Sequence, residues 1–208
     1  MPKNTREPQQ ARSIEKKTRI LDAAMNQFDE HGFDGTNAKT IAKAAGVSIG
    51  TFYAYFTDKK ALLMDVFMRH LDEVDQSVLS RMDQTVREGA SGREIVRIGL
   101  KVAHATHIQQ PGFMRMMLGM RYTDNSMRRF MEAEDKVIHV RLHQLLESLK
   151  PRLRVTDIEA AVTVVEKAIE EIVHASIVFD APIEQSRIDD ALVDMIATYL
   201  FKEPDARA

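Results

Sequence analysis

The sequence predicts an all-α protein, with a three-helix N-terminal head that carries a helix-turn-helix and a larger helical body behind it. Apolar residues recur at spacings of three and four in nearly every segment, and no segment alternates as a half-buried strand would. Two short helix patterns near residue 46 are separated only by a glycine-containing turn. With 208 residues, 44% of them hydrophobic, the chain can bury a sizeable core without disulfides, which the absence of cysteine excludes.

The expected helices begin and end at recognisable capping residues. Thr36 is the expected N-cap of the second helix, Gly46 ends that helix, Ser48 caps the third, and Thr57 or Asp58 caps the fourth. The predicted helices cover about residues 13–31, 37–45, 49–55, a fourth that extends into the seventies or eighties, and then about 92–109, 112–121, 125–149, 156–179 and 185–201.

Composition narrows the compartment and the partners. The first thirteen residues are polar, and no apolar run approaches the roughly 18 residues of a membrane span, so we expect a cytoplasmic protein that makes no membrane contact. Residues 1–60 hold ten Lys and Arg against seven Asp and Glu, whereas the remaining residues hold nineteen against twenty-four. A basic head on an acidic body is typical of a protein that presents one end to phosphates, although a solvated N-terminal tail has the same composition.

The third helix sorts its side chains in a way that suits a DNA groove. On a helical wheel Phe52 and Phe56 share the inner face, with Ile49 near its edge, whereas Gly50, Thr51 and Ala54 occupy the outer face and Tyr53 and Tyr55 the flanks. A small-sided outer face lets the backbone sit deep in a major groove about 12 Å wide, with the tyrosine hydroxyls directed at phosphates and the Ala54 methyl at a thymine methyl. A helical hairpin with an aromatic core and two surface tyrosines is the structural alternative.

The head resembles the tetracycline-repressor (TetR) family of bacterial regulators over about fifty residues. The residues that carry the resemblance are Ile20, Leu21, Asp22, Ala23, Ala24, Phe28, Gly32, Phe33, Thr40, Ile41, Ala42, Ala44, Ala45, Gly46, Val47, Ser48, Gly50, Thr51, Phe52, Tyr53, Tyr55, Phe56, Lys59, Leu62 and Leu63. It implies a DNA-binding domain over residues 1–60, ordered from about residue 13, and an effector-binding and dimerisation domain over residues 61–208.

The resemblance also implies DNA-contacting roles for individual residues. Lys39 matches a position that reaches bases or backbone, and Lys59 matches a phosphate contact at the start of the fourth helix. Thr36 and Ser48 match phosphate-contacting caps, Ile49, Gly50 and Thr51 match the base-reading start of the recognition helix, and Tyr53 and Tyr55 match its phosphate clamps. Ile49 departs from the polar base reader that many relatives carry, which leaves the operator sequence open.

In the body, six of the twelve methionines fall between residues 114 and 131, which suits an adaptable apolar cavity as well as an ordinary core. The family resemblance implies an effector pocket among the fourth to eighth helices. Its candidate lining is Phe67, Leu71, His104, His107, Phe113, Met117, Met120, Arg121 and Phe130. We therefore expect a small, largely apolar effector, with Arg121 either receiving an anionic head group or serving as a surface or interface charge.

Two other sequence patterns resemble a metal site and a catalytic site, and neither supports such a site well. Two metal ligands could share one helix face where histidines lie three or four residues apart, or where Glu171 precedes His174 by three residues. We expect these histidines instead to be hydrogen-bonded within the protein or to face solvent. We therefore predict no metal and no cofactor. Residues 46–50 match the G-x-S-x-G pattern of a nucleophile elbow, which requires a preceding strand. A helix precedes Ser48 here, so we expect that the protein is not an enzyme and has no catalytic residue.

The last two long helices carry more apolar surface than one helix pair needs to cover itself. The candidate dimer interface comprises Ile158, Val162, Val165, Ile169, Ile172, Ile188, Leu192, Met195, Ile196 and Tyr199. Pairing of two copies would form a four-helix bundle, as in the family that the head resembles. Because such a dimer has two-fold symmetry, we expect its operator to be near-palindromic. The alternative is that both helices simply close the monomer core. The expected function is a ligand-released repressor. An activator of the same fold is the alternative, and a helical protein-binding adaptor is the remaining one.

Overall fold

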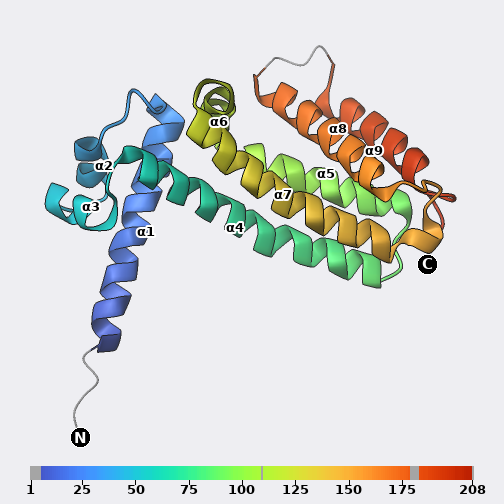
Figure 1. Ribbon diagram of the computed structural model, residues 1–208, viewed down its shortest axis with the longest axis horizontal. Coiled ribbons are helices and arrows are strands. Elements are labelled where there is room, and N and C mark those ends of the chain that lie inside the picture. Colours follow the sequence, from blue (N-terminus) through green and yellow to red (C-terminus); the bar gives the residue numbers. More distant parts are fainter. Residues whose placement is uncertain (1–5, 109, 179–182, 208) are drawn as a thin grey trace, which may run out of the picture. The chain divides into compact units, whose positions relative to one another are not determined.

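The computed structural model describes residues 6–108, 110–178 and 183–207, with side chains described except at 6–10, 73–83, 87, 106–108 and 177–178. Within these ranges the regular structure is helical apart from one isolated bridge between Leu153 and Phe201, so the all-α class is confirmed (Figure 1). The helices are α1 (Arg6–His31), α2 (Ala38–Ala44), α3 (Ile49–Tyr55), α4 (Lys59–Arg87), α5 (Gly92–Ile108), α6 (Pro111–Thr123), α7 (Asn125–Ser148), the 3-10 helix η1 (Lys150–Arg152), α8 (Ile158–Val178) and α9 (Gln185–Leu200).

The start of α1 and an additional 3-10 helix differ from the expected pattern, and the cap of α4 is one of the two residues expected. Helix α1 begins at Arg6 rather than near residue 13, because good helix formers fill this stretch and Pro8 falls in the first turn, where no N–H is needed. Of the two expected caps of α4, Asp58 is the one used, since its carboxylate accepts the Ala61 N–H at 2.8 Å. The 3-10 helix η1 was not predicted, and Pro151 falls at its start.

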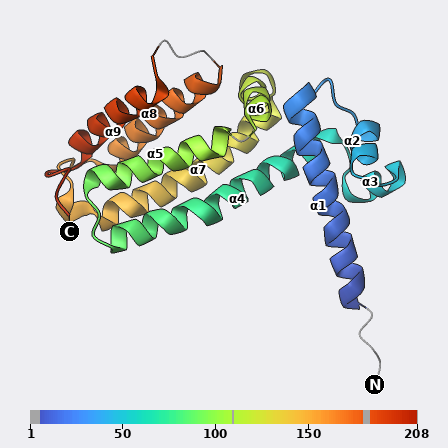
Figure 2. The ribbon, with the colours of Figure 1, turned by 180° about the vertical axis from the view of Figure 1, so that it is seen from behind.

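The chain packs into two compact units. The head unit comprises residues up to Asp72 together with Gln110–Met116, and the body unit comprises Glu73–Gln109 and Met117–Ala208. Helices α4 and α6 therefore begin in the head unit and end in the body unit. Figure 2 shows the same helices from behind.

In the head unit, α1 packs against α2 and α2 packs against α3, because each presents one apolar face. The largest side chains of this core that are fully buried are Phe28, Phe52, Phe113, Ile20, Ile41, Leu62, Leu63 and Val66. The first turn of α6 is fixed to α1, since the Phe113 N–H donates to Asp29 Oδ1 at 2.8 Å. A side chain at Gly112 would lie 2.1 Å from the Asp29 carbonyl oxygen, so this contact requires glycine.

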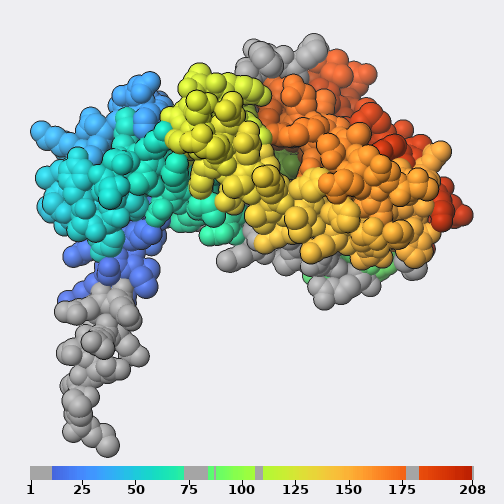
Figure 3. Space-filling model, viewed as in Figure 1, coloured from blue at the N-terminus to red at the C-terminus, as the bar shows by residue number. Residues whose placement is uncertain are grey.

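In the body unit, α5 packs against both α8 and α9, and α7 packs against α8. The space-filling view shows a hollow in the surface between α7 and α8 (Figure 3). The residue after α9, Phe201, packs against the first residue of α5, Gly92. Phe201 is buried there, and a Cβ at Gly92 would come within 2.4 Å of its ring. Among the described helices, none is long and apolar enough to cross a membrane.

Candidate nucleic-acid interface

The turn before α2 places Thr36 inside the head unit, which corrects two expectations. Asn37 is the N-cap of α2: its side chain accepts the Lys39 and Thr40 N–H groups, and Thr40 completes a capping box. Thr36 is only 1% exposed, and its hydroxyl lies 3.0 Å from the Gln27 carbonyl oxygen and 2.8 Å from that of Gly32. The N-cap assigned to Thr36 was therefore wrong, and its buried hydroxyl has no access to a phosphate. The Asn-x-x-Thr spacing was the overlooked sequence feature.

The turn between α2 and α3 is fixed by glycine geometry. Gly46 has φ 64°, and the Gly46 and Val47 N–H groups donate to the carbonyls of Lys43 and Ala42. This pairing is a Schellman motif, which needs a left-handed residue at Gly46. Ser48 then caps α3 by accepting the Thr51 N–H at 3.0 Å, so the predicted cap is confirmed. The Ser48 hydroxyl also lies 2.9 Å from the Thr51 hydroxyl.

Helix α3 divides into an inner and an outer face as the wheel predicts. Phe52 and Phe56 are buried, and their ring centroids lie 5.9 Å apart. Gly50 and Ala54 are exposed, and Tyr53 is 57% exposed. The side chain of Ile49 is 44% exposed, so it lies at the outer edge rather than in the core. The result is a helix anchored by two phenylalanines whose outer surface is small-sided.

Two of the expected phosphate contacts have intramolecular partners. The Tyr55 hydroxyl donates to the Ser13 carbonyl at 3.1 Å and lies 2.9 Å from the Ser13 hydroxyl, which ties α3 to α1. Lys59 Nζ donates to the carbonyls of Phe33 and Thr36 and lies 4.0 Å from the Phe33 ring centroid. Lys59 therefore holds the turn that precedes α2, and Nζ keeps one N–H for an external acceptor. Sequence reasoning missed both partners because they are distant in the chain.

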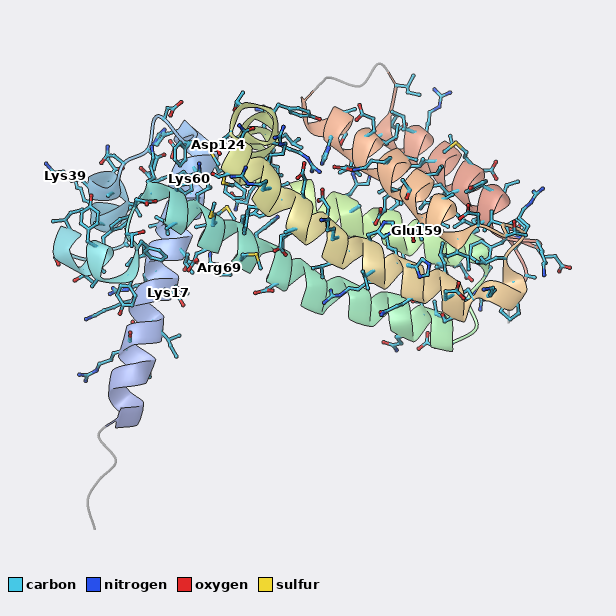
Figure 4. All side chains as sticks on the ribbon, viewed as in Figure 1. Lys17, Lys39, Lys60, Arg69, Asp124 and Glu159 are labelled. Carbon is cyan, nitrogen blue, oxygen red and sulfur yellow. The ribbon has the colours of Figure 1, made fainter. Side chains whose placement is uncertain are left out.

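The outer surface of α2 and α3 carries cations without intramolecular partners. Lys39 is exposed and extends from α2 (Figure 4), and Lys43 is exposed at the end of the same helix. Neither forms an ion pair with any described residue. Exposed cations beside a small-sided helix face suit a polyanionic partner.

The candidate effector lining divides between the two units. Phe67, Leu71 and Phe113 belong to the head unit, where the Phe67 and Phe113 ring centroids lie 6.5 Å apart. His104, Met117, Met120, Arg121 and Phe130 belong to the body unit, and the His107 side chain lies outside the described residues. Two pockets on the described surface are lined by other residues.

Two polar members of that set have structural partners. The Arg121 guanidinium bridges Asp135 of α7 and Glu170 of α8, so both of its neighbours are carboxylates. An anionic head group would have to displace one of them. His104 is buried, and its Nε2 lies 3.0 Å from Asp189 of α9 while its Nδ1 has no described hydrogen-bond partner.

The histidines of α7 contact acids of α8. His139 places Nδ1 2.8 Å from Glu166 and Nε2 3.2 Å from Glu159, and the hydrogen bond to Glu166 is the main cause of a raised His139 pKa. His143 lies 3.7 Å from Glu159. Burial lowers the pKa of His174 on α8. Within the described residues no group of three or more His, Asp or Glu side chains has a geometry that could hold a metal ion.

The candidate dimer interface needs correction at five positions. Ile158, Val162, Val165, Leu192 and Ile196 are buried within the protomer, because the strongest apolar stripes of α8 and α9 face α5 and α7 of the same chain. Ile169, Ile172 and Ile188 are half-buried. Among the described side chains, the large apolar ones that α8 and α9 expose are Met195 at 55% and Tyr199 at 39%, both of which were expected, and Val164 at 54%, which the sequence argument omitted. Met195 and Tyr199 line a shallow groove with Arg154, Val155, Asp194 and Thr198.

Comparison with known families and structures matches both units. Residues 20–66 match the family described as bacterial regulatory proteins, tetR family, and residues 93–200, more than half of the chain, match the tetracyclin repressor-like C-terminal domain. The fatty acid metabolism regulator protein of Bacillus subtilis is 33% identical over 75 residues, which are 36% of this chain and 37% of that protein. The regulator UidR of Escherichia coli is 40% identical over 53 residues, 26% of this chain and 27% of UidR. The chain thus spans about a third of the length of these curated relatives.

Solved structures extend the likeness over nearly the whole fold. The fatty acid degradation regulator FadR from Bacillus halodurans superposes with a TM-score of 0.73 at 22% identity, covering 87% of this chain and 94% of that one. FadR from Bacillus subtilis, solved in complex with stearoyl-CoA, has a TM-score of 0.70 at 20% identity, covering 88% of this chain and 98% of that one. At this identity the likeness concerns the fold alone. From the two family matches it follows that the chain belongs to the TetR family of bacterial transcriptional regulators.

Proposed function

We propose that this protein is a repressor that binds a near-palindromic operator as a homodimer and leaves it when a small, largely apolar effector binds. The observation that carries the proposal is the outer face of α3, which is small-sided and exposed while Phe52 and Phe56 anchor the opposite face in the head core. A helix that presents so little bulk can approach the floor of a major groove closely.

On this proposal each residue of the outer surface contacts a particular part of the DNA. Thr51 and Ile49 lie at the N-terminal end of α3, which enters the groove, so Thr51 offers a hydroxyl to a base edge and Ile49 an apolar contact to a thymine methyl. Tyr53, which is 57% exposed, reaches a phosphate on one groove wall. Lys39 and the free N–H of Lys59 supply charge to the backbone on the other side.

Dimerisation is proposed through the exposed apolar residues of α8 and α9. Val164, Met195 and Tyr199 expose large apolar side chains on two helices of the body unit, where a second copy covers them around a two-fold axis. A two-fold axis presents two α3 helices to half-sites about 34–36 Å apart, or a little more, which makes the operator near-palindromic.

Effector control is proposed to act through the two helices that both units share. Helix α4 crosses from one unit to the other, and so does α6, whose first turn is tied to α1 by the Phe113 N–H and Asp29. An effector that binds the body unit and prefers one arrangement of these helices shifts the population away from the DNA-binding arrangement. Stearoyl-CoA is the first probe, because the B. subtilis fold neighbour was solved with it.

The test is selection of bound duplexes from random DNA, followed by retardation of the selected operator on a gel at low ionic strength. We expect a near-palindromic consensus, one dimer per operator by light scattering, and release by stearoyl-CoA, whose acyl chain is apolar although its CoA group is anionic, or by an apolar ligand. The ligand that releases the DNA should also raise the melting temperature. Failure to retard any duplex refutes the DNA-binding function. Retardation that no apolar ligand reverses refutes the effector class alone.

A further inference from the structure

Three basic side chains form one exposed stripe on the N-terminal half of α1. Arg12, Lys16 and Arg19 lie within about 60° of one another on a helical wheel, and all three are exposed. Among residues 11–19 the one carboxylate is Glu15, so this stretch is strongly basic. We refer to Arg12, Lys16 and Arg19 as the basic stripe.

The basic stripe differs from Lys17 and Arg69 of the head unit in having no described partner. Lys17 pairs with Asp65 at 2.8 Å, and Arg69 pairs with Asp22 at 2.8 Å. Lys17 and Arg69 are both labelled in Figure 4. The stripe residues form no ion pair with any described residue. Like charges three and four positions apart on a helix repel each other, so the stripe weakens α1 unless an anion lies against it.

The stripe lies on the side of α1 that faces the helix-turn-helix. One turn beyond Arg19, Ala23 is on the same face of α1 and is buried, and it lines one pocket together with Ala44 and Ala45 at the end of α2. Arg19 lies beside the α2–α3 turn, with its Nη1 3.9 Å from the position of a Cβ at Gly46. Figure 1 shows the N-terminal half of α1 continuing past α3, to which the Ser13–Tyr55 hydrogen bonds tie it.

We infer that the basic stripe binds duplex DNA at phosphates that flank the half-site read by α3. The inference rests on the proposed function and extends its DNA surface along α1. Arg12 and Arg19 are separated by about 10 Å along the helix axis, whereas duplex DNA carries a phosphate charge about every 1.7 Å of its own axis. Three phosphates are therefore within the span of the stripe, and such contacts add affinity and fix the register without reading sequence.

The test compares salt dependence in two charge-matched variants of the full chain. R12Q/K16Q/R19Q removes the stripe, and K101Q/R129Q/K136Q removes three exposed cations of the body unit. Log affinity falls with log salt, and three lost phosphate contacts make this negative slope less steep by about 2.7. The wild type should then lose about 40-fold more affinity than the stripe variant between 50 and 200 mM salt. The control variant should keep the wild-type slope, and melting temperatures check that both variants fold.

Duplex length separates this inference from a general charge effect. On an operator trimmed to its two half-sites, the stripe variant and the wild type should have the same slope, because the flanking phosphates are gone. A stripe variant that keeps the wild-type slope on long operators overturns the inference and leaves the proposed function intact. A wild-type protein that binds no duplex overturns both.

Discussion

Replacing Thr36 by valine separates a structural role of this residue from a DNA-contacting one. Thr36 is 1% exposed, and its hydroxyl donates to the Gln27 and Gly32 carbonyls, which lie at 3.0 and 2.8 Å. Valine has nearly the same shape but no donor, so T36V leaves buried carbonyl oxygen without this partner. Because no solvent reaches the site, we expect the whole effect to appear in stability and none in the affinity for DNA.

The magnitude follows from the burial. Leaving a buried polar group unsatisfied costs about 1–3 kcal/mol. In a chain of this size each kcal/mol lowers the melting temperature by about 2–4 °C. A central loss of about 2 kcal/mol therefore lowers the melting temperature of T36V by about 4–8 °C. Operator affinity measured well below that temperature should stay within about twofold of wild type, since about 0.4 kcal/mol or less would be involved.

Thermal unfolding and operator titration on the same preparations test this prediction. T36S is the matched control, because it keeps the hydroxyl and loses only a methyl group, at about 0.8 kcal/mol. Its melting temperature should lie between those of T36V and the wild type. The reasoning is refuted if T36V melts like the wild type while its operator affinity falls tenfold, because that result requires an exposed hydroxyl that contacts phosphate.

Three further predictions concern other parts of the molecule. Y53F should weaken binding to all operators by about 10- to 150-fold without lowering the melting temperature, since a lost bond to a charged phosphate is worth about 1.5–3 kcal/mol. Y55F should instead lower the melting temperature, because Tyr55 bonds to Ser13. The opposite pattern in a titration and a melt would exchange the two roles. Light scattering should show M195D as a monomer at concentrations where the wild type is a dimer, and a dimeric M195D would place the interface elsewhere. The hydrogen bond to Glu166 raises the His139 pKa in the folded protein, so the stability that this ion pair adds is complete below the pKa of the unfolded state and is lost as pH rises through the pKa of the folded state. The melting temperature of H139Q should therefore differ from that of the wild type more at pH 6 than at pH 9. A difference in melting temperature that is independent of pH would contradict the ion pair.

The sequence alone determined the features that depend on neighbouring residues. The helix order, the glycine that ends α2 and the Ser48 cap follow from local backbone preferences, which operate within a turn or two of chain. The division of α3 into a buried phenylalanine face and a small outer face also follows, because the helix repeat fixes which side chains share a face. The helix-turn-helix and its outer surface were therefore predictable.

The tertiary structure alone decided which of several suitable residues each element uses. Asn37 rather than Thr36 caps α2, since the Thr36 hydroxyl is drawn to carbonyls of α1 and of the turn after it. The Tyr55 hydroxyl bonds to Ser13, forty-two residues away. The apolar stripes of α8 and α9 that appeared available for a partner cover α5 and α7 of the same chain. A periodic pattern shows that a face must be covered, but the element that covers it depends on packing between distant segments.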